Sequence, residues 1–431
     1  MRRPLILLVS LVATLALAVG AARAAGADGI DRTYGEGGIV DLAGPEVPGS
    51  TVSAQEVSSF GAAKDGSVYL LGSAYECNPG SSCGYVYSLR RSESDGKPDV
   101  GFGGSGVVPL SAGLRDSVIA DHDAALVAGF VEKTVTLRRF TVDGTPDPGF
   151  GGDGVVQIPC DCGYSHLHVL IDRAGRIVID VDTSIPADGF YEQGTEVRLT
   201  RLLPDGAVDR RFGTAGTLRF AIHTPGEPHA VVTDAADGIL VGGFGSAGPA
   251  GCCGRRHIYL RRVTGEGRLD RRFDAGAARS LKRLAVPGKY PALVALVPGR
   301  GGTVSALGYT GERGGFDLRL GRDGKVLSGF GTRGVLHLPF TLEGAVGGTD
   351  GAVFAVGALD KRPYGYRAFR ILANGALDPA YNRGRGVGVP ISGVRIGLAA
   401  LDGGRVLVTD NGNHYCRYAC SSTPTMVRFL E

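Results

Sequence analysis

Beyond its N-terminus, the sequence lacks a long apolar run, helical periodicity and an excess of either charge. The apolar pieces after residue 24 are short, rich in Val, Ile and Leu, and closed by Gly, Asp or Pro. Without a long apolar run, this part of the chain has no candidate membrane span. Without a 3.6-residue period, it is not a helical bundle. With 71 glycines and 22 prolines, the short runs predict a turn-rich β protein.

The charge balance excludes one class of partner. The chain has 46 Lys and Arg against 43 Asp and Glu, and residues 1–24 hold three arginines and no acid. The remainder therefore carries 43 side chains of each sign. Because nucleic-acid-binding proteins normally show a basic excess or a basic stripe, we predict no nucleic-acid partner.

The N-terminus has the pattern of a secretory signal. Arg2 and Arg3 precede an apolar run over residues 5–19, and small residues follow, ending in Ala22-Arg23-Ala24. This order predicts a signal peptide over 1–24, cleaved after Ala24, and a secreted or cell-envelope protein. An uncleaved membrane anchor is the alternative, although the run is short for a span. We expect residues 25–431 to form a single domain.

One turn-and-strand signature occurs seven times along the chain. Its copies span residues 28–42, 95–110, 143–158, 205–220, 266–281, 323–338 and 374–389. Each copy has one aromatic residue at the same register: Tyr34, Phe102, Phe150, Phe212, Phe273, Phe330 and Tyr381. An alternating strand precedes copies two to seven, and a second hairpin lies earlier in each unit. Each unit therefore holds about four strands, which is one propeller blade.

The unmatched ends of the repeat predict how the ring closes. Residues 38–42 form a strand with no hairpin partner before it, and residues 425–431 form a strand with no signature after it. Pairing these two strands would leave no open sheet edge. We predict an all-β, seven-bladed β-propeller of four-stranded antiparallel blades, closed by its N- and C-terminal strands. An open solenoid is the alternative, but its end units usually look like caps.

The signature resembles that of the delta-60 repeat family of exported bacterial proteins, which has a core like DG-x-LD-x-x-FG-x-x-G. The resemblance covers almost the whole chain after residue 24. It implies a propeller-like fold and no common activity or catalytic residues. Two copies depart from the pattern: Asp274 replaces a glycine in copy five, and Leu327 replaces the aspartate in copy six. We expect those two blades to be irregular.

Several motifs that suggest chemistry are better explained as repeat turns. The glycine runs 101–106 and 149–154 fit a dinucleotide fingerprint but lead into strands rather than helices. Ser82 fits a nucleophile elbow but lies between two strands. Six aspartates recur three residues before the aromatic, and we expect each to accept hydrogen bonds from its own turn. They are Asp31, Asp99, Asp147, Asp209, Asp270 and Asp378.

Eight cysteines fall in four close pairs: Cys77/Cys83, Cys160/Cys162, Cys252/Cys253 and Cys416/Cys420. An even number in an exported chain predicts disulfides. The first and last pairs bond locally with least difficulty, whereas bonds within the middle pairs would close strained rings, so cross-pairing between those two stays open. In the blade scheme all eight lie on one rim, where connecting loops meet the channel mouth. This rim is the predicted functional surface.

One segment of that rim is a candidate metal site. Cys160, Cys162, His166 and His168 lie within nine residues, and thiols with imidazoles bind zinc or copper. Oxidised cysteines with ordinary histidines are the alternative, which export favours. Apart from this site we predict no cofactor.

The sequence favours a non-enzymatic, monomeric binding or scaffold propeller with a protein or glycan ligand. The alternative is an envelope or secreted enzyme, a hydrolase, lyase or oxidoreductase, with its site at the channel mouth. A purely structural protein without a deep polar pocket is a third possibility. The candidate channel-mouth residues are His166, His168, His229, His414 and Asp410.

Overall fold

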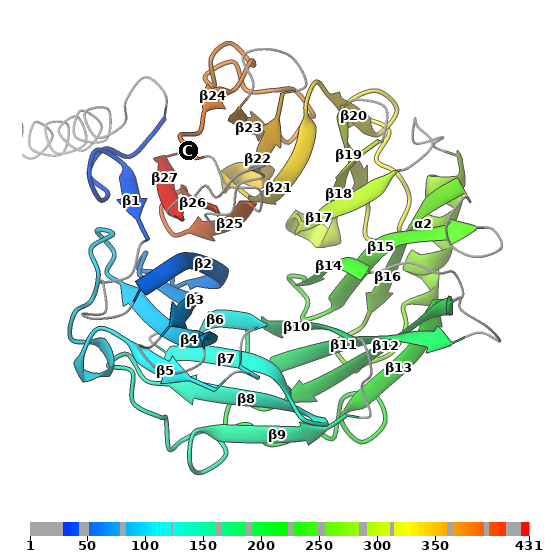
Figure 1. Ribbon diagram of the computed structural model, residues 1–431. Coiled ribbons are helices and arrows are strands. Elements are labelled where there is room, and N and C mark those ends of the chain that lie inside the picture. The colour runs from blue at the N-terminus through cyan, green and yellow to red at the C-terminus, as the bar shows by residue number, and fades with distance from the viewer. Residues whose placement is uncertain are drawn as a thin grey trace, which may run out of the picture.

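The β-strands form seven antiparallel sheets around a central axis, which confirms the predicted seven-bladed β-propeller (Figure 1). The structure is a computed structural model. It describes residues 29–42, 51–77, 83–111, 113–114, 116–121, 124–160, 165–186, 192–222, 228–247, 255–283, 291–310, 314–359, 365–391, 396–410 and 424–430. The predicted signal peptide over 1–24 lies outside these residues. Within them, no helix is both long and apolar enough to cross a membrane.

Each blade is labelled by strands a to d from the channel outward. The a strands are β2 (Thr51–Ala62), β6 (Ser117–Asp121), β10 (Ser165–Ile171), β14 (Pro228–Thr233), β17 (Ala292–Pro298), β21 (Thr341–Gly347) and β25 (Ile396–Leu401). The b strands are β3 (Val68–Cys77), β7 (Ala124–Val131), β11 (Ile177–Pro186), β15 (Ile239–Ala247), β18 (Val304–Tyr309), β22 (Val353–Ala358) and β26 (Arg405–Asp410).

The outer half of each blade follows the same order. The c strands are β4 (Cys83–Ser92), β8 (Thr134–Phe140), β12 (Glu192–Leu202), β16 (Arg255–Val263), β19 (Gly315–Leu320), β23 (Tyr366–Ile371) and β27 (Thr425–Leu430). The d strands are β5 (Val108–Leu110), β9 (Val155–Pro159), β13 (Thr217–Ile222), β20 (Val335–Leu338), β24 (Val387–Gly388) and β1 (Ile39–Asp41). Short 3-10 turns occur at Phe102–Gly104, Arg300–Gly302 and Thr349–Gly351.

The ring closes as the unmatched ends of the repeat predict. Strand β1 pairs antiparallel with β27, with Ile39 opposite Val427 and Asp41 opposite Thr425. The seventh sheet therefore has the order β1-β27-β26-β25, combining the beginning and the end of the chain. Closure removes the open edge that either strand would otherwise present.

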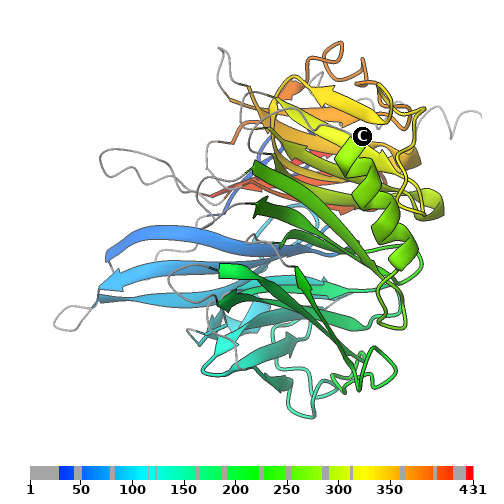
Figure 2. The same cartoon turned by 90° about the vertical axis from the view of Figure 1, so that its right-hand side faces the viewer.

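The antiparallel order gives the ring two different faces, seen from the side in Figure 2. The a–b and c–d turns, including every signature, lie on one face, here called the signature face. The b–c and d–a connections lie on the other, here called the loop face. The first blade projects furthest toward the loop face, because β2 has 12 residues and β3 and β4 have 10 each (Figure 2).

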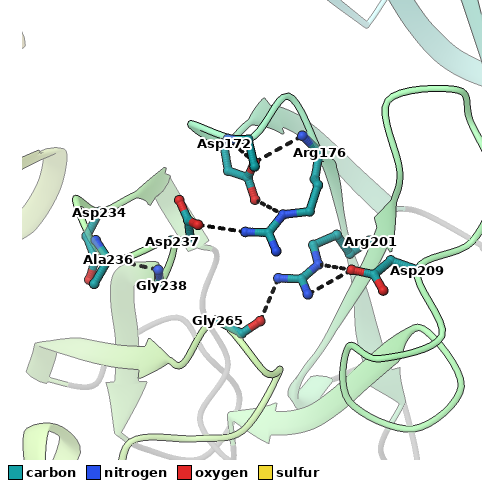
Figure 3. Close-up of polar contacts among 10 residues, drawn as sticks. Asp172, Arg176, Arg201, Asp209, Asp234, Ala236, Asp237, Gly238 and Gly265 are labelled. Atoms are coloured by element: carbon teal, nitrogen blue, oxygen red, sulfur yellow. Dashed lines mark hydrogen bonds and ion pairs between the residues drawn. The ribbon is translucent and has the colours of Figure 1, made fainter.

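The signature forms contacts between neighbouring blades, here called interblade clasps. At the clasp between the third and fourth blades, the Arg201 guanidinium lies 2.8 Å from the Asp209 carboxylate of its own blade (Figure 3). It also donates a 2.6 Å hydrogen bond to the Gly265 carbonyl of the next blade, and it lies 4.5 Å over the Phe212 ring. Beside it, Arg176 bridges Asp172 and Asp237 across the same boundary (Figure 3). These contacts connect sheets that share no backbone ladder.

The same arrangement recurs around the ring. The c-strand arginine pairs with the signature aspartate at Arg91–Asp99, Arg139–Asp147, Arg201–Asp209, Arg370–Asp378 and Arg428–Asp31. All seven signature aromatics are buried. Each of the six predicted turn aspartates accepts a backbone N–H from the residue two positions later, which confirms their role.

The fourth blade differs from the others. It has three strands among the described residues, and helix α2 (Arg271–Arg283) packs against β16 in the place of strand d. Asp270 caps the helix by accepting the N–H groups of Arg272 and Phe273. Copy five thus diverges where the sequence indicates, since Asp274 replaces a glycine that has positive φ in other copies, such as Gly213 at +56°.

The sixth signature copy belongs to a sheet with the regular order β17-β18-β19-β20, so the irregularity expected from Leu327 is absent from the strand order. The Leu327 N–H still donates to the Arg319 carbonyl, as the signature aspartates do in other copies. Only the side-chain pair is missing. Arg319 instead contacts Ser305 and lies 3.8 Å from Asp317.

Candidate functional site

Three of the eight cysteines lie among the described residues, and all three are at loop-face ends of strands. Cys77 ends β3 and Cys83 begins β4, directly opposite it in the register. Cys160 follows β9, is 3% exposed and is disulfide-bonded. Cys162, Cys252, Cys253, Cys416 and Cys420 lie outside the described residues, so the rest of the predicted rim and its pairing stay predictions.

Three of the five predicted channel-mouth residues have described side chains, and these three come from two blades: His166 and His168 from the third, Asp410 from the seventh. His166 is exposed on β10 in the third blade. Asp410 ends β26 in the seventh blade and is 2% exposed. His229 belongs to β14, at a register irregularity, and its side chain is outside the described set, as is all of His414. A catalytic cluster of these five residues is therefore not seen in the part of the chain that the structure describes.

Asp410 contributes to the wall of a hollow between the seventh and first blades. Its carboxylate accepts hydrogen bonds of 3.0 Å from the N–H and the Oγ1 hydroxyl of Thr425, which fix its orientation. The hollow has a volume of about 240 Å³. Its lining comes from β2, β25 and β26: Val57, Ser58, Ser59, Phe60, Ile396, Gly397, Thr409 and Asp410.

A glycine shapes this hollow. A Cβ built on Gly397 would lie 2.2 Å from the Phe60 ring and 2.8 Å from Thr409 Oγ1. Only glycine at this position therefore lets the half-buried Phe60 ring lie over the start of β25. The result is an aromatic face beside hydroxyl and carboxylate groups.

Tyr366 of the sixth blade lies near Asp410, and Glu343 of the same blade lies near Tyr366. Burial raises the pKa of Glu343 on β21 above its ordinary value. The pKa of Tyr366, at the start of β23, is also raised by burial and further by the negative charges of Glu343 and Asp410. Both carboxylates are therefore close enough to act on the Tyr366 hydroxyl. We call Phe60, Glu343, Tyr366 and Asp410 the acidic-aromatic patch.

A different polar group lies inside the third blade. His168 on β10 and Asp180 on β11 are opposite each other in the register, and His168 Nδ1 is 3.5 Å from Asp180 Oδ2. Asp182 lies two residues further along β11 on the same face. One ligand atom from each of the three residues lies within 4.8 Å of the other two. This group shares only His168 with the metal site predicted from the sequence. Cys160 of that predicted site is disulfide-bonded and not available as a thiolate.

Sequence reasoning identified His168 in this group but not Asp180 or Asp182. The only signal was the alternation Ile177-Val178-Ile179-Asp180-Val181-Asp182, in which two acids occupy positions of a strand that is otherwise apolar. Acids at consecutive same-face positions of a buried strand point to a polar site, because an unpaired charge is costly to bury.

The signature face has a hollow of about 650 Å³ between the second and third blades. Three of its charged lining residues already belong to a clasp: Arg139 pairs with Asp147 and Asp121 and donates to the Pro204 carbonyl. The groups on this side hold blades together, so the loop-face half of the channel is the better candidate for ligand binding.

No protein-family model and no curated protein matches this chain. Among solved structures it is similar to the α-L-arabinanase of Penicillium chrysogenum complexed with arabinobiose, at 12% identity over 91% of this chain and 97% of that chain, with a TM-score of 0.42. It is also similar to polysaccharide lyase Uly1, at 9% identity over 92% of this chain and 93% of that chain, with a TM-score of 0.48. A third similar structure is BBS1N in complex with ARL6DN, at 10% identity over 91% and 97% of the two chains, with a TM-score of 0.41. Similarity at this level assigns no activity to the chain.

Proposed function

We propose that this protein is an exported, non-catalytic propeller that binds a glycan at the acidic-aromatic patch beside its central channel. The observation that carries the proposal is the hollow between β2 and β25, where the Phe60 ring lies beside hydroxyl groups and the Asp410 carboxylate. We also propose that residues 1–24 are a cleaved signal, that disulfides brace the loop face and that the repeat is of the delta-60 type.

The chemistry of the patch fits a hydroxyl-rich ligand. Carboxylates are pure acceptors and can each receive several hydrogen bonds from sugar hydroxyls. An aromatic ring offers a flat apolar face to the C–H side of a pyranose. Small pockets of this kind combine apolar walls with a few placed polar groups that fix ligand orientation.

The state of Asp410 supports binding rather than catalysis. Thr425, which belongs to the strand that pairs with β1, donates two hydrogen bonds to the Asp410 carboxylate. These hydrogen bonds hold the carboxylate in one orientation in the wall of the hollow, where it can accept hydrogen bonds from a ligand. The nearby Glu343 has a raised pKa, so it can also donate a hydrogen bond to a sugar oxygen when it is protonated.

Calorimetric titration of the purified mature protein with a panel of probes tests the proposal. The probes are arabinan and xylan oligosaccharides, chitin oligosaccharides and a muropeptide disaccharide. We expect at least one to bind, and Phe60→Ala and Glu343→Gln to weaken that binding at least tenfold. Arg300→Ala, an exposed change on the signature face, is the matched control and should bind like the wild type.

Three results would overturn this function. If no probe binds at millimolar concentration, or if both patch variants bind as tightly as the wild type, the patch is not the glycan site. If a probe is consumed, with release of reducing ends or of unsaturated sugars, the protein is an enzyme instead.

A further inference from the structure

Two carboxylates are buried in the wall between the third and fourth blades. Asp180 is 0% exposed and Asp182 is 2% exposed. They alternate along β11, so they share the face that packs toward the fourth blade. Tyr259 on β16 is 6% exposed and packs in the same interblade core as Val197 and Leu199 of the third blade.

Several atoms of this group lack the partners that buried polar atoms normally have. Neither carboxylate oxygen of Asp180 has a hydrogen-bond partner among the described residues, nor does His168 Nδ1 or the Tyr259 hydroxyl. Buried side-chain polar atoms are nearly always hydrogen-bonded, and an uncompensated buried carboxylate is costly. The group is therefore incomplete as it stands.

For Asp180, His168 is the basic side chain that the described part of the chain supplies. Burial raises the pKa of Asp180, and among the described groups only His168 acts in the opposite direction. Arg261 is close enough to act on Tyr259, but its own ion-pair partner is Asp274, at 3.8 Å. The charges of Asp182 and Asp180 both act on the Tyr259 hydroxyl, so Tyr259 lies close to the group that His168, Asp180 and Asp182 form.

We propose that His168, Asp180 and Asp182 bind a divalent transition-metal ion, such as Zn²⁺, with the Tyr259 hydroxyl facing its remaining coordination position. This site lies between the third and fourth blades, whereas the acidic-aromatic patch lies on blades one, six and seven. The inference therefore stands independently of the proposed glycan binding.

The geometry suits the ion. With metal–ligand bonds of about 2.1 Å, ligand atoms of a tetrahedral zinc site lie about 3.4 Å apart. The 3.5 Å between His168 Nδ1 and Asp180 Oδ2 matches that spacing. The third ligand atom lies within 4.8 Å, a distance that a small change in side-chain torsion closes. A mixed imidazole and carboxylate set favours zinc or manganese over calcium.

An entry path and a consequence follow from the position of His168. Its side chain is 33% exposed at the channel, so an ion can reach the site without opening the blade interface. An ion bound there would neutralise two buried charges at the contact between two sheets, and so strengthen that contact.

The test uses the full mature protein after removal of metal with EDTA. Calorimetric titration with Zn²⁺, and separately with Mn²⁺, should show one bound ion per chain and a raised unfolding temperature. Asp180→Asn and His168→Ala should each weaken binding at least 100-fold. The control is His166→Ala, an exposed histidine two residues away on the same strand, which should bind normally.

Folding and ligand identity are checked separately. The unfolding temperature of metal-free Asp180→Asn should equal or exceed that of the metal-free wild type, because the variant removes a buried charge. The Co²⁺-substituted protein should show ligand-field bands without thiolate absorption. The proposal is overturned if the wild type binds no metal or if Asp180→Asn binds metal as tightly as the wild type. It is also overturned if a thiolate band appears and His166→Ala loses binding.

Discussion

The guanidinium of Arg428 lies 2.8 Å from the carboxylate of Asp31, a contact between residues 397 positions apart. The same arginine donates a 2.6 Å hydrogen bond to the Ser94 carbonyl and lies 4.2 Å over the Tyr34 ring. One buried side chain thus connects the last strand, the first signature and the first blade. The clasp that recurs inside the ring also holds its two ends together.

Replacing Arg428 with alanine should destabilise ring closure. The variant leaves Asp31 buried without its charge partner, and loss of one partner from a buried pair costs about 3 kcal/mol or more. The pKa of Asp31 is lower in the folded protein than its ordinary value. The stability that its charge contributes is therefore lost as pH falls below about 4. The Arg428→Ala penalty, read from urea unfolding, should therefore shrink on acidification.

Hydrogen exchange locates the effect of this change. The amides of Ile39–Asp41 should exchange faster in Arg428→Ala, while those of β7 stay protected. Lys97→Ala removes an exposed ion pair with Asp95 and should leave stability almost unchanged, because solvent screens such pairs. Equal effects of the two substitutions would contradict the role given to Arg428.

Leu327→Asp should stabilise the protein. The backbone at Leu327 already follows that of the signature aspartates, since its N–H donates to the Arg319 carbonyl. A carboxylate there would lie near Arg319, which now has Ser305 and Asp317 as neighbours. A gain of about 1 kcal/mol is expected for a partly exposed pair. Thermal or urea unfolding measures the gain. The control is Leu327→Asn, which has the shape of aspartate without its charge and should give a smaller gain. A loss of stability in Leu327→Asp would contradict the prediction.

Asp317 should make stability depend on pH near neutrality. Burial raises its pKa to about 7, against opposing contributions from Arg319 and Ser305. A raised carboxyl pKa means that the folded state holds a proton that the unfolded state releases, so wild-type stability falls as pH rises from about 4 to 7. Asp317→Asn removes this titration. The unfolding free energy of the variant minus that of the wild type should rise across this pH range, by at most about 1.4 kcal/mol per pH unit. The difference should become constant above about pH 8.

Asp350→Asn is the control for that experiment, because its side chain is 87% exposed. Its difference from the wild type should not vary between pH 5 and 8. A difference between Asp317→Asn and the wild type that is constant over the whole range would show that Asp317 is ionised throughout.

Gly276→Ala in α2 has two opposing effects on stability, one from helix propensity and one from steric overlap. Helix propensity alone favours alanine by about 1 kcal/mol. However, a Cβ on Gly276 would lie 1.9 Å from the Asp323 carbonyl oxygen on the next blade. We expect a net loss of about 1 to 3 kcal/mol from this overlap. Thermal unfolding decides the sign, and Ala275→Gly at an exposed helix position should cost only the propensity term. A stabilised Gly276→Ala would show that α2 moves away from its neighbour without cost.

The fold could be predicted because its information is local and periodic. The spacing of the seven aromatics and the unmatched strands at 38–42 and 425–431 were enough to give the blade count and the closing pair. The function of the clasp arginines could not be predicted in the same way. Arg201 reaches Asp209 on its own blade but also Gly265 on the next, and no spacing in the sequence reveals that second contact. The change from strand to helix in copy five was signalled only by Asp274.

The candidate sites were predictable only in part, for the same reason. Asp410 and His168 were identified as candidates, but Phe60 and Tyr259 reach their sites from other blades. Asp180 and Asp182 read as ordinary members of a hairpin until the register placed Asp180 opposite His168. Sites between blades depend on which faces pack together, and that is decided by the closed ring rather than by any one repeat.

The pairing of β1 with β27 also determines when the ring can close during synthesis. Because β1 pairs with β27, residues 39–41 keep an open edge during synthesis until residues 425–427 have been made. Contacts so far apart in sequence form slowly, and open strand edges promote association between chains. Interrupted synthesis before Thr425 should therefore give an aggregation-prone chain rather than a smaller propeller.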